Sequence, residues 1–128
     1  MTRPTLRLGA TVLGAKSARA LAAFYRDLLG WEITDDRPHW VELPAPDGGA
    51  GLSFQTEENH VPPVWPTTED EQQMMMHLDI SVSDLDEAAA VAEALGASLA
   101  PWQPRDDVRV MIDPAGHPFC LYEPGHTA

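Results

Sequence analysis

Two side chains combine reactive chemistry with a place in a patterned segment, and these are His77 and Cys120. An imidazole has a pKa near ~6.5, so His77 could act as an acid or base, contact a substrate, bind a metal ion, or simply hydrogen-bond its neighbours. Cys120 is the only cysteine. It would be a nucleophile only beside a cation that lowers its pKa, such as His117 or Arg109; otherwise it is a small buried apolar side chain.

Aromatic side chains supply a second kind of chemistry, the stacking of flat ligands. Trp40 and Tyr122 lie in strand-like runs, and Trp65 lies in a Pro-rich segment. Each of them could instead fill the core or an interface between copies. We expect Trp65 to pack one half of the chain on the other, to form the rim of a cavity, or both. We expect Trp102 to fill space beside a helix.

The charge balance argues against several kinds of partner. Eight Lys and Arg against twenty Asp and Glu give a formal net charge of −12. Because nucleic acids and anionic membranes bind basic surfaces, we expect neither as a partner. The sequence also lacks a phosphate-binding glycine loop, a dinucleotide fingerprint and a nucleophile elbow. From the single Cys and the lack of an apolar leader, we expect a soluble protein of the cytoplasm.

Two amphipathic segments predict the helices that position these side chains. The first runs from Ser17 to Gly30, with Ser at the N-cap and Gly for the left-handed turn that ends the helix. The second runs from Ser83 to Gly96 and has the same residue types at its ends. The two segments therefore have matching lengths and matching end signals.

An extended run precedes each predicted helix, and three strand-like runs follow it. The predicted strands are residues 6–13, 31–34, 39–43, 51–55, 74–82, 97–102, 108–112 and 118–122. Each half thus has the order β-α-β-β-β, which indicates an internal duplication. We expect one α+β domain over residues 1–128, with an N-terminal module (5–56), a joining segment (57–73) and a C-terminal module (74–124) that together form a curved, open-barrel cavity.

Alternation along the strands divides their side chains between a face covered by the helix and an opposite face. An opposite face of mixed polarity on a curved sheet is a typical place for a ligand. Asp79 shares this face with His77 by alternation. The residues that we predict to bind a ligand are Trp40, Ser53, Gln55, Trp65, His77, Cys120 and Tyr122.

Three segments of the chain resemble the vicinal oxygen chelate superfamily, which includes glyoxalase I, extradiol dioxygenases and bleomycin-resistance proteins. They are Leu-Ala-Ala-Phe-Tyr-Arg-Asp-Leu-Leu-Gly-Trp (21–31), His-Leu-Asp-Ile-Ser-Val-Ser-Asp-Leu-Asp (77–86) and Asp-Pro-Ala-Gly-His-Pro-Phe-Cys-Leu-Tyr-Glu (113–123). The two modules that carry them cover nearly the whole chain. The resemblance implies a glyoxalase-like fold of two modules, and it implies a homodimer because many relatives are dimers.

The resemblance also implies where a metal centre would lie. In the enzymes of this superfamily, four side chains hold a divalent cation such as Zn, Ni, Mn or Fe. The corresponding positions here are Ala10 (Thr11 if the register slips by one), Ser53, His77 and Cys120. His77 alone is a conventional ligand. A mixed site of His77 and Cys120 would be soft and would need two more ligands, for which Asp79 and Glu42 are the nearest spare acids.

We therefore predict a glyoxalase-like protein that binds a small aromatic or multi-oxygen organic molecule, without a cofactor and without a conventional metal centre. Two alternatives stay open. One is a divergent metal-dependent lyase, isomerase or dioxygenase of the glyoxalase type, with His77 as a ligand. The other is a metal-free enzyme that uses His77 as a general base, with Cys120 or Tyr122 assisting.

Overall fold

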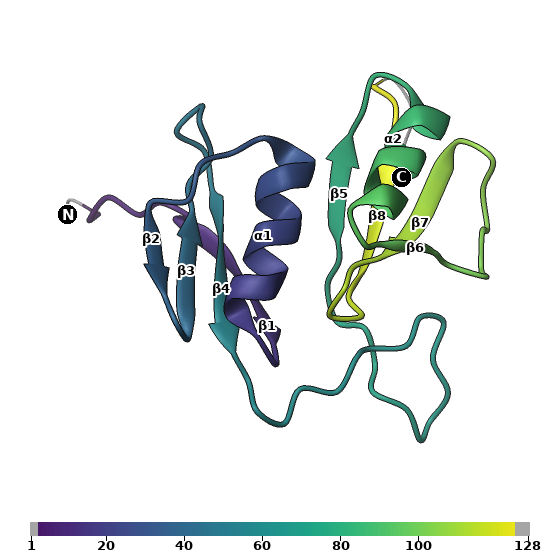
Figure 1. Cartoon of the computed structure of the whole chain (residues 1–128), viewed down its shortest axis with the longest axis horizontal. Helices are drawn as coiled ribbons and strands as arrows, with labels where there is room; N and C mark the ends of the chain where they lie inside the picture. The colour runs from purple at the N-terminus through teal and green to yellow at the C-terminus, as the bar shows by residue number, and fades with distance from the viewer. Residues whose placement is uncertain (1–2, 125–128) are drawn as a thin grey trace. The chain divides into compact units, whose positions relative to one another are not determined.

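The computed structural model describes residues 3–124 and shows two compact units, Met1–Glu58 and Asn59–Ala128. Each unit contains one helix and one four-stranded sheet (Figure 1). Over residues 3–124 the strands of each sheet pair only within their own unit, so the two sheets are not closed into a barrel. The predicted α+β class and the predicted duplication of a β-α-β-β-β module are confirmed.

The first unit has the strand order β1-β4-β3-β2, with β1 and β4 parallel and the other pairs antiparallel. Its elements are β1 (Ala10–Ala15), α1 (Ala18–Leu29), β2 (Asp35–Arg37), β3 (Trp40–Leu43) and β4 (Gly51–Thr56). Helix α1 packs on β3 and β4. The core of the first unit includes Tyr25, whose ring stacks on Phe54 with a centroid distance of 5.9 Å. Both side chains are fully buried.

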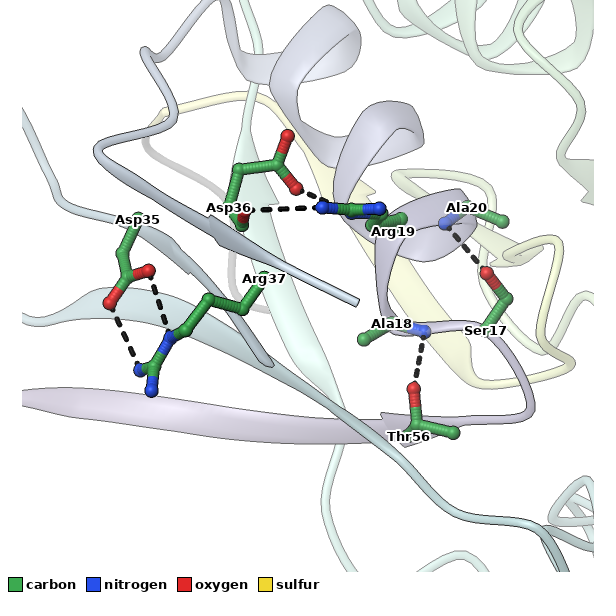
Figure 2. Close-up of polar contacts among 8 residues, drawn as sticks. All are labelled: Ser17, Ala18, Arg19, Ala20, Asp35, Asp36, Arg37 and Thr56. Atoms are coloured by element: carbon green, nitrogen blue, oxygen red, sulfur yellow. Dashed lines mark hydrogen bonds and ion pairs between the residues drawn. The ribbon is translucent and has the colours of Figure 1, made fainter. Parts of the chain in front are cut away.

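Helix α1 begins and ends at the predicted signals. The Ser17 hydroxyl accepts a hydrogen bond from the Ala20 N–H at 3.1 Å, and the Thr56 hydroxyl accepts one from the Ala18 N–H at 3.2 Å (Figure 2). These contacts satisfy two backbone donors that the first turn leaves free, and Thr56 ties the helix to the end of β4. Gly30 ends the helix with φ of 69°, in the left-handed region that glycine adopts readily.

The second unit repeats this topology in the order β5-β8-β7-β6. Its elements are β5 (Leu78–Ser81), α2 (Leu85–Ala94), β6 (Ser98–Leu99), β7 (Val108–Ile112) and β8 (Pro118–Tyr122). Helix α2 packs on β6, β7 and β8. Among residues 3–124, neither helix combines the length and the apolar character that crossing a membrane requires.

The predicted N-cap of the second helix is wrong by one residue. Asp84, not Ser83, caps α2, and its carboxylate accepts a hydrogen bond from the Glu87 N–H at 3.0 Å. A carboxylate is favoured at this position because the helix dipole is positive there. Ser83 and Asp84 are neighbouring residues that both suit an N-cap, and the charged Asp84 caps the helix.

Several predicted strands are too long, because a strand continues only where a neighbouring strand offers hydrogen-bond partners. The first strand begins at Ala10 rather than at residue 6, because Ala10 pairs with Gly51, the first residue of its partner strand β4. Likewise β5 begins at Leu78 rather than at residue 74. The predicted strand over residues 31–34 is absent, and β2 forms instead at Asp35–Arg37, where a tight turn pairs it with β3.

The predicted strand over residues 97–102 is reduced to β6 because Pro101 has no N–H to donate. The Gln103 side chain takes over the pairing with β7. Its amide nitrogen donates to the carbonyl oxygens of Ala100 and Val110 at 2.9 and 2.8 Å, and its amide oxygen accepts from the Val110 N–H at 3.0 Å. Gln103 thereby fastens the segment that carries Trp102 to the sheet.

The turn before β8 holds part of the joining segment. The buried Asp113 carboxylate accepts hydrogen bonds from the N–H groups of Ala115 and His117 at 2.9 and 3.0 Å. Gly116 has φ of 93°, and a Cβ built on it would lie 2.5 Å from the Cβ of Pro62. Glycine is thus needed at this turn both for its backbone conformation and for the close approach of the joining segment.

We predict that Gly116→Ala lowers the free energy of unfolding by about 1 to 3 kcal/mol, because the new methyl group meets a left-handed backbone and a neighbouring proline. Gly9→Ala is the matched control, since a Cβ at Gly9 meets nothing within 4 Å. Urea denaturation of both variants measures the effect. Equal stability of the two variants would contradict the close packing of Pro62 on this turn.

Candidate functional site

The candidate site lies on the face of the second sheet that is opposite α2. In the strand register, Asp79 on β5 pairs with Cys120 on β8, and Cys120 pairs with Val110 on β7. Paired residues project to the same face of a sheet, and their neighbours along the strands project to the other. Phe119 and Met111, which pair with each other, accordingly belong to the face that α2 covers and are fully buried.

Three polar side chains gather on this opposite face. The His77 Nδ1 atom lies 3.0 Å from the Asp79 Oδ1 atom. One nitrogen, oxygen or sulfur atom from each of His77, Asp79 and Cys120 lies within 4.8 Å of the others. The His77 and Asp79 side chains are 26% and 40% exposed, whereas Cys120 is buried. A solute can thus reach the imidazole and the carboxylate from outside.

Cys120 is held as a neutral thiol. Burial raises the pKa of the Cys120 thiol to about 11, and the Asp79 carboxylate adds to the rise through its charge and its hydrogen bond with the thiol. Arg109, a cation that could have opposed this, pairs in register with Leu121 on the other face and forms an ion pair with Asp86 at 3.0 Å. The raised pKa and the placement of Arg109 on the other face both argue against Cys120 as a nucleophile.

Trp65 connects the polar cluster to an apolar groove. Its indole ring stacks on the His77 ring with a centroid distance of 4.8 Å, and it meets the edge of Trp102 at 4.8 Å. Both indoles pack on a buried cluster of Ala100, Val108, Val110 and Cys120, which Tyr122 also contacts. The groove has a volume of about 370 Å³ and is lined by Pro63, Val64, Trp65, Pro66, Ala100, Pro101, Trp102, Val110, Ile112 and Pro118.

The sequence located part of this arrangement. His77, Cys120 and Tyr122 lie on one face of the second sheet, as alternation predicted, and Trp65 of the joining segment packs on the same face. A role for these four residues in ligand binding stays a prediction. The prediction that Trp102 fills space beside the second helix is wrong, because Trp102 packs on Trp65 and on the opposite face. The signal for this was Pro101, which ends the edge strand and lets the chain turn away.

The three predicted residues of the first unit also share one face of their sheet. Trp40 pairs with Gln55 across β3 and β4, and Ser53 lies two residues before Gln55. The Trp40 indole N–H donates to the Glu42 carboxylate at 2.8 Å, which makes Glu42 a partner of Trp40. Gln55 donates a hydrogen bond to Glu57. A role for Trp40, Ser53 and Gln55 in ligand binding stays a prediction.

The donors do not fit the four-ligand metal centre that the resemblance implies. The β1–β4 register pairs Val12 with Ser53, as the β5–β8 register pairs Asp79 with Cys120. Ala10, two residues before Val12, is therefore the counterpart of His77, and the slip to Thr11 is excluded. A methyl group at the first position and a hydroxyl at the second offer a hard divalent cation far too little.

We predict that iodoacetamide alkylates Cys120 in the folded protein at pH 7.5 at least tenfold more slowly than in urea, because only the thiolate reacts. Asp79→Asn removes a nearby negative charge, so it should speed alkylation of the folded protein. Asp86→Asn is the control, since Asp86 is highly exposed and pairs with Arg109. Mass spectrometry measures the rates; alkylation of the folded protein at the urea rate would contradict the description of this thiol.

Residues 10–122, which span the two modules from the start of β1 to the end of β8, match the glyoxalase-like domain family. The structure is similar to that of a glyoxalase/bleomycin resistance protein/dioxygenase family enzyme from Burkholderia phytofirmans, with 18% identity, a TM-score of 0.68 and coverage of 92% of this chain and 98% of that chain. It is also similar to lactoylglutathione lyase from Agrobacterium tumefaciens, with 21% identity, a TM-score of 0.62 and coverage of 94% and 96%. No curated protein matches the chain.

Proposed function

The chain belongs to the glyoxalase-like domain family of the vicinal oxygen chelate superfamily, and from this premise we propose that it binds a small aromatic or multi-oxygen organic molecule without a conventional metal centre. The observation that carries the proposal is the groove beside Trp65 and Trp102, on the face of the second sheet that is opposite α2. Its volume of about 370 Å³ falls in the range of small-molecule sites.

The groove and the polar cluster beside it suit different parts of one ligand. The lining consists of Pro, Val, Ile, Ala and Trp side chains, which favour a flat apolar body. At the edge of the groove, the His77 ring stacks on Trp65 and contacts the Asp79 carboxylate. These two side chains offer hydrogen bonds to oxygen atoms of a ligand, so we infer a flat molecule with oxygen substituents at one end.

We predict that a ligand of this class raises the melting temperature of the wild-type protein. At a hundredfold excess over Kd, binding adds about 2.7 kcal/mol to the free energy of unfolding. A thermal-shift panel of flavonoids, anthraquinones and naphthols, measured in the presence of EDTA, supplies the ligands. Trp65→Ala should abolish the shift by removing a wall of the groove, whereas Trp31→Ala, in the first unit, should keep it.

The outcome that contradicts this proposal is also specific. If no member of the panel shifts the melting temperature while the hemithioacetals that thiols form with 2-oxoaldehydes are turned over, the protein is an enzyme of the glyoxalase type. An equal shift in the wild type and in Trp65→Ala would place the ligand elsewhere on the protein.

One observation favours a second candidate function, a metal-free enzyme that transfers protons. A carboxylate 3.0 Å from one imidazole nitrogen orients the ring and leaves the other nitrogen free to accept a proton. His77 would be the base and Asp79 the residue that positions it. Exchange of ligand C–H protons for deuterium, lost in His77→Gln, distinguishes this function from binding alone.

We also propose that the protein is a homodimer. Strands β1 and β5 are edge strands of their sheets, and exposed apolar side chains precede each of them in the chain: Leu6 and Leu8 before β1, Met75 and Met76 before β5. Light scattering should give twice the chain mass. Leu8→Glu combined with Met76→Glu should give the mass of one chain, whereas Val91→Glu on α2 should not. A wild-type protein with the mass of one chain would contradict the proposal.

A further inference from the structure

The polar cluster of the second unit has the composition and spacing of a metal-binding site of its own. Its three donors come from the segment His77–Asp79 and from β8, two neighbouring parts of one sheet. The nitrogen, oxygen and sulfur atoms converge without any contribution from the first unit. Asp79 lies between the other two donors: one of its carboxylate oxygens is 3.0 Å from the His77 nitrogen, and it pairs with Cys120 in the β5–β8 register.

We propose that His77, Asp79 and Cys120 bind a thiophilic divalent cation, such as Zn²⁺ or Cd²⁺. Metal–ligand bonds of about 2.0 to 2.3 Å place neighbouring ligands of a tetrahedral ion about 3.3 to 3.7 Å apart. The imidazole and carboxylate atoms already lie 3.0 Å apart, and the widest separation in the cluster is within 4.8 Å. Small rotations of the two partly exposed side chains bring the three atoms to the required spacing.

This site differs from the four-ligand centre of the superfamily. All three donors lie in one module, Asp79 is not one of the family positions, and a thiol stands where a carboxylate is usual. A thiolate and an imidazole favour Zn²⁺ and softer ions over Mg²⁺ and Mn²⁺. With three protein ligands, one position stays open for water or for an oxygen atom of a ligand.

Charge and proton balance also suit such an ion. Binding removes one proton from the Cys120 thiol and releases it to solvent, and His77 binds through a ring nitrogen that carries no proton. The ionised Asp79 carboxylate and the new thiolate together carry two negative charges, which neutralise the divalent cation. A neutral complex avoids most of the desolvation cost that an unpaired charge would meet beside a buried strand.

The test is a titration of the untagged protein with Cd²⁺, monitored by the ultraviolet charge-transfer absorption of a cadmium–thiolate bond. We expect saturation at one ion per chain, release of one proton per ion, and no competition from excess Mg²⁺. Cys120→Ser should abolish the absorption band. Asp79→Asn and His77→Gln should weaken binding at least tenfold, and His39→Gln, an exposed histidine of the first unit, is the matched control that should not.

The proposal fails if the wild-type protein gives no saturable thiolate band, or if Asp79→Asn and His77→Gln bind Cd²⁺ as tightly as the wild type. If Cys120→Ser does not fold, the Asp79→Asn and His77→Gln variants, which change partly exposed side chains, test the proposal. The proposal does not rest on the organic ligand of the groove. Because the thermal-shift panel is measured in EDTA, each of the two proposals can fail while the other stands.

Discussion

The parallel pairing of β5 with β8 determines which side chains share the face of the second sheet that is opposite α2. The register places Asp79 beside Cys120, and it keeps Phe119 and Leu121 on the face that packs against α2. A shift of one residue would exchange the two faces and would bury a carboxylate under the helix. The fully buried Phe119 and Leu121 therefore fix the position of the polar cluster, although neither belongs to it.

The joining segment contributes Trp65 to the site, beside the polar cluster. Close packing of Pro62 on Gly116 and the contact of His60 Nε2 with the Ala115 carbonyl oxygen at 2.8 Å hold the segment on the turn before β8. Trp65 is thereby presented to both His77 and Trp102. One aromatic side chain thus contacts both the apolar groove and the polar cluster, and this contact places the His77 imidazole beside the groove.

The sequence predicted what depends on local signals. Ser17 and Gly30 mark the ends of α1, and alternation sorts Cys120 from Phe119. Strand lengths could not be predicted in this way, because they depend on where a partner strand begins, as Ala10 shows opposite Gly51. For the same reason the distance between Asp79 and Cys120, which are far apart in the chain, required the register itself. The amide of Gln103, which replaces strand pairing, also has no counterpart in a sequence pattern.

Nuclear Overhauser effects between backbone protons of β5 and β8 test this register most directly, together with those between the rings of Trp65 and His77. The structure predicts effects that connect Leu78 with Phe119 and Asp79 with Cys120, and ring contacts between the indole and the imidazole. Effects displaced by one residue, which would connect Asp79 with Phe119 or Leu121, would turn the carboxylate away from the thiol. That result would contradict both the site and the functions derived from it.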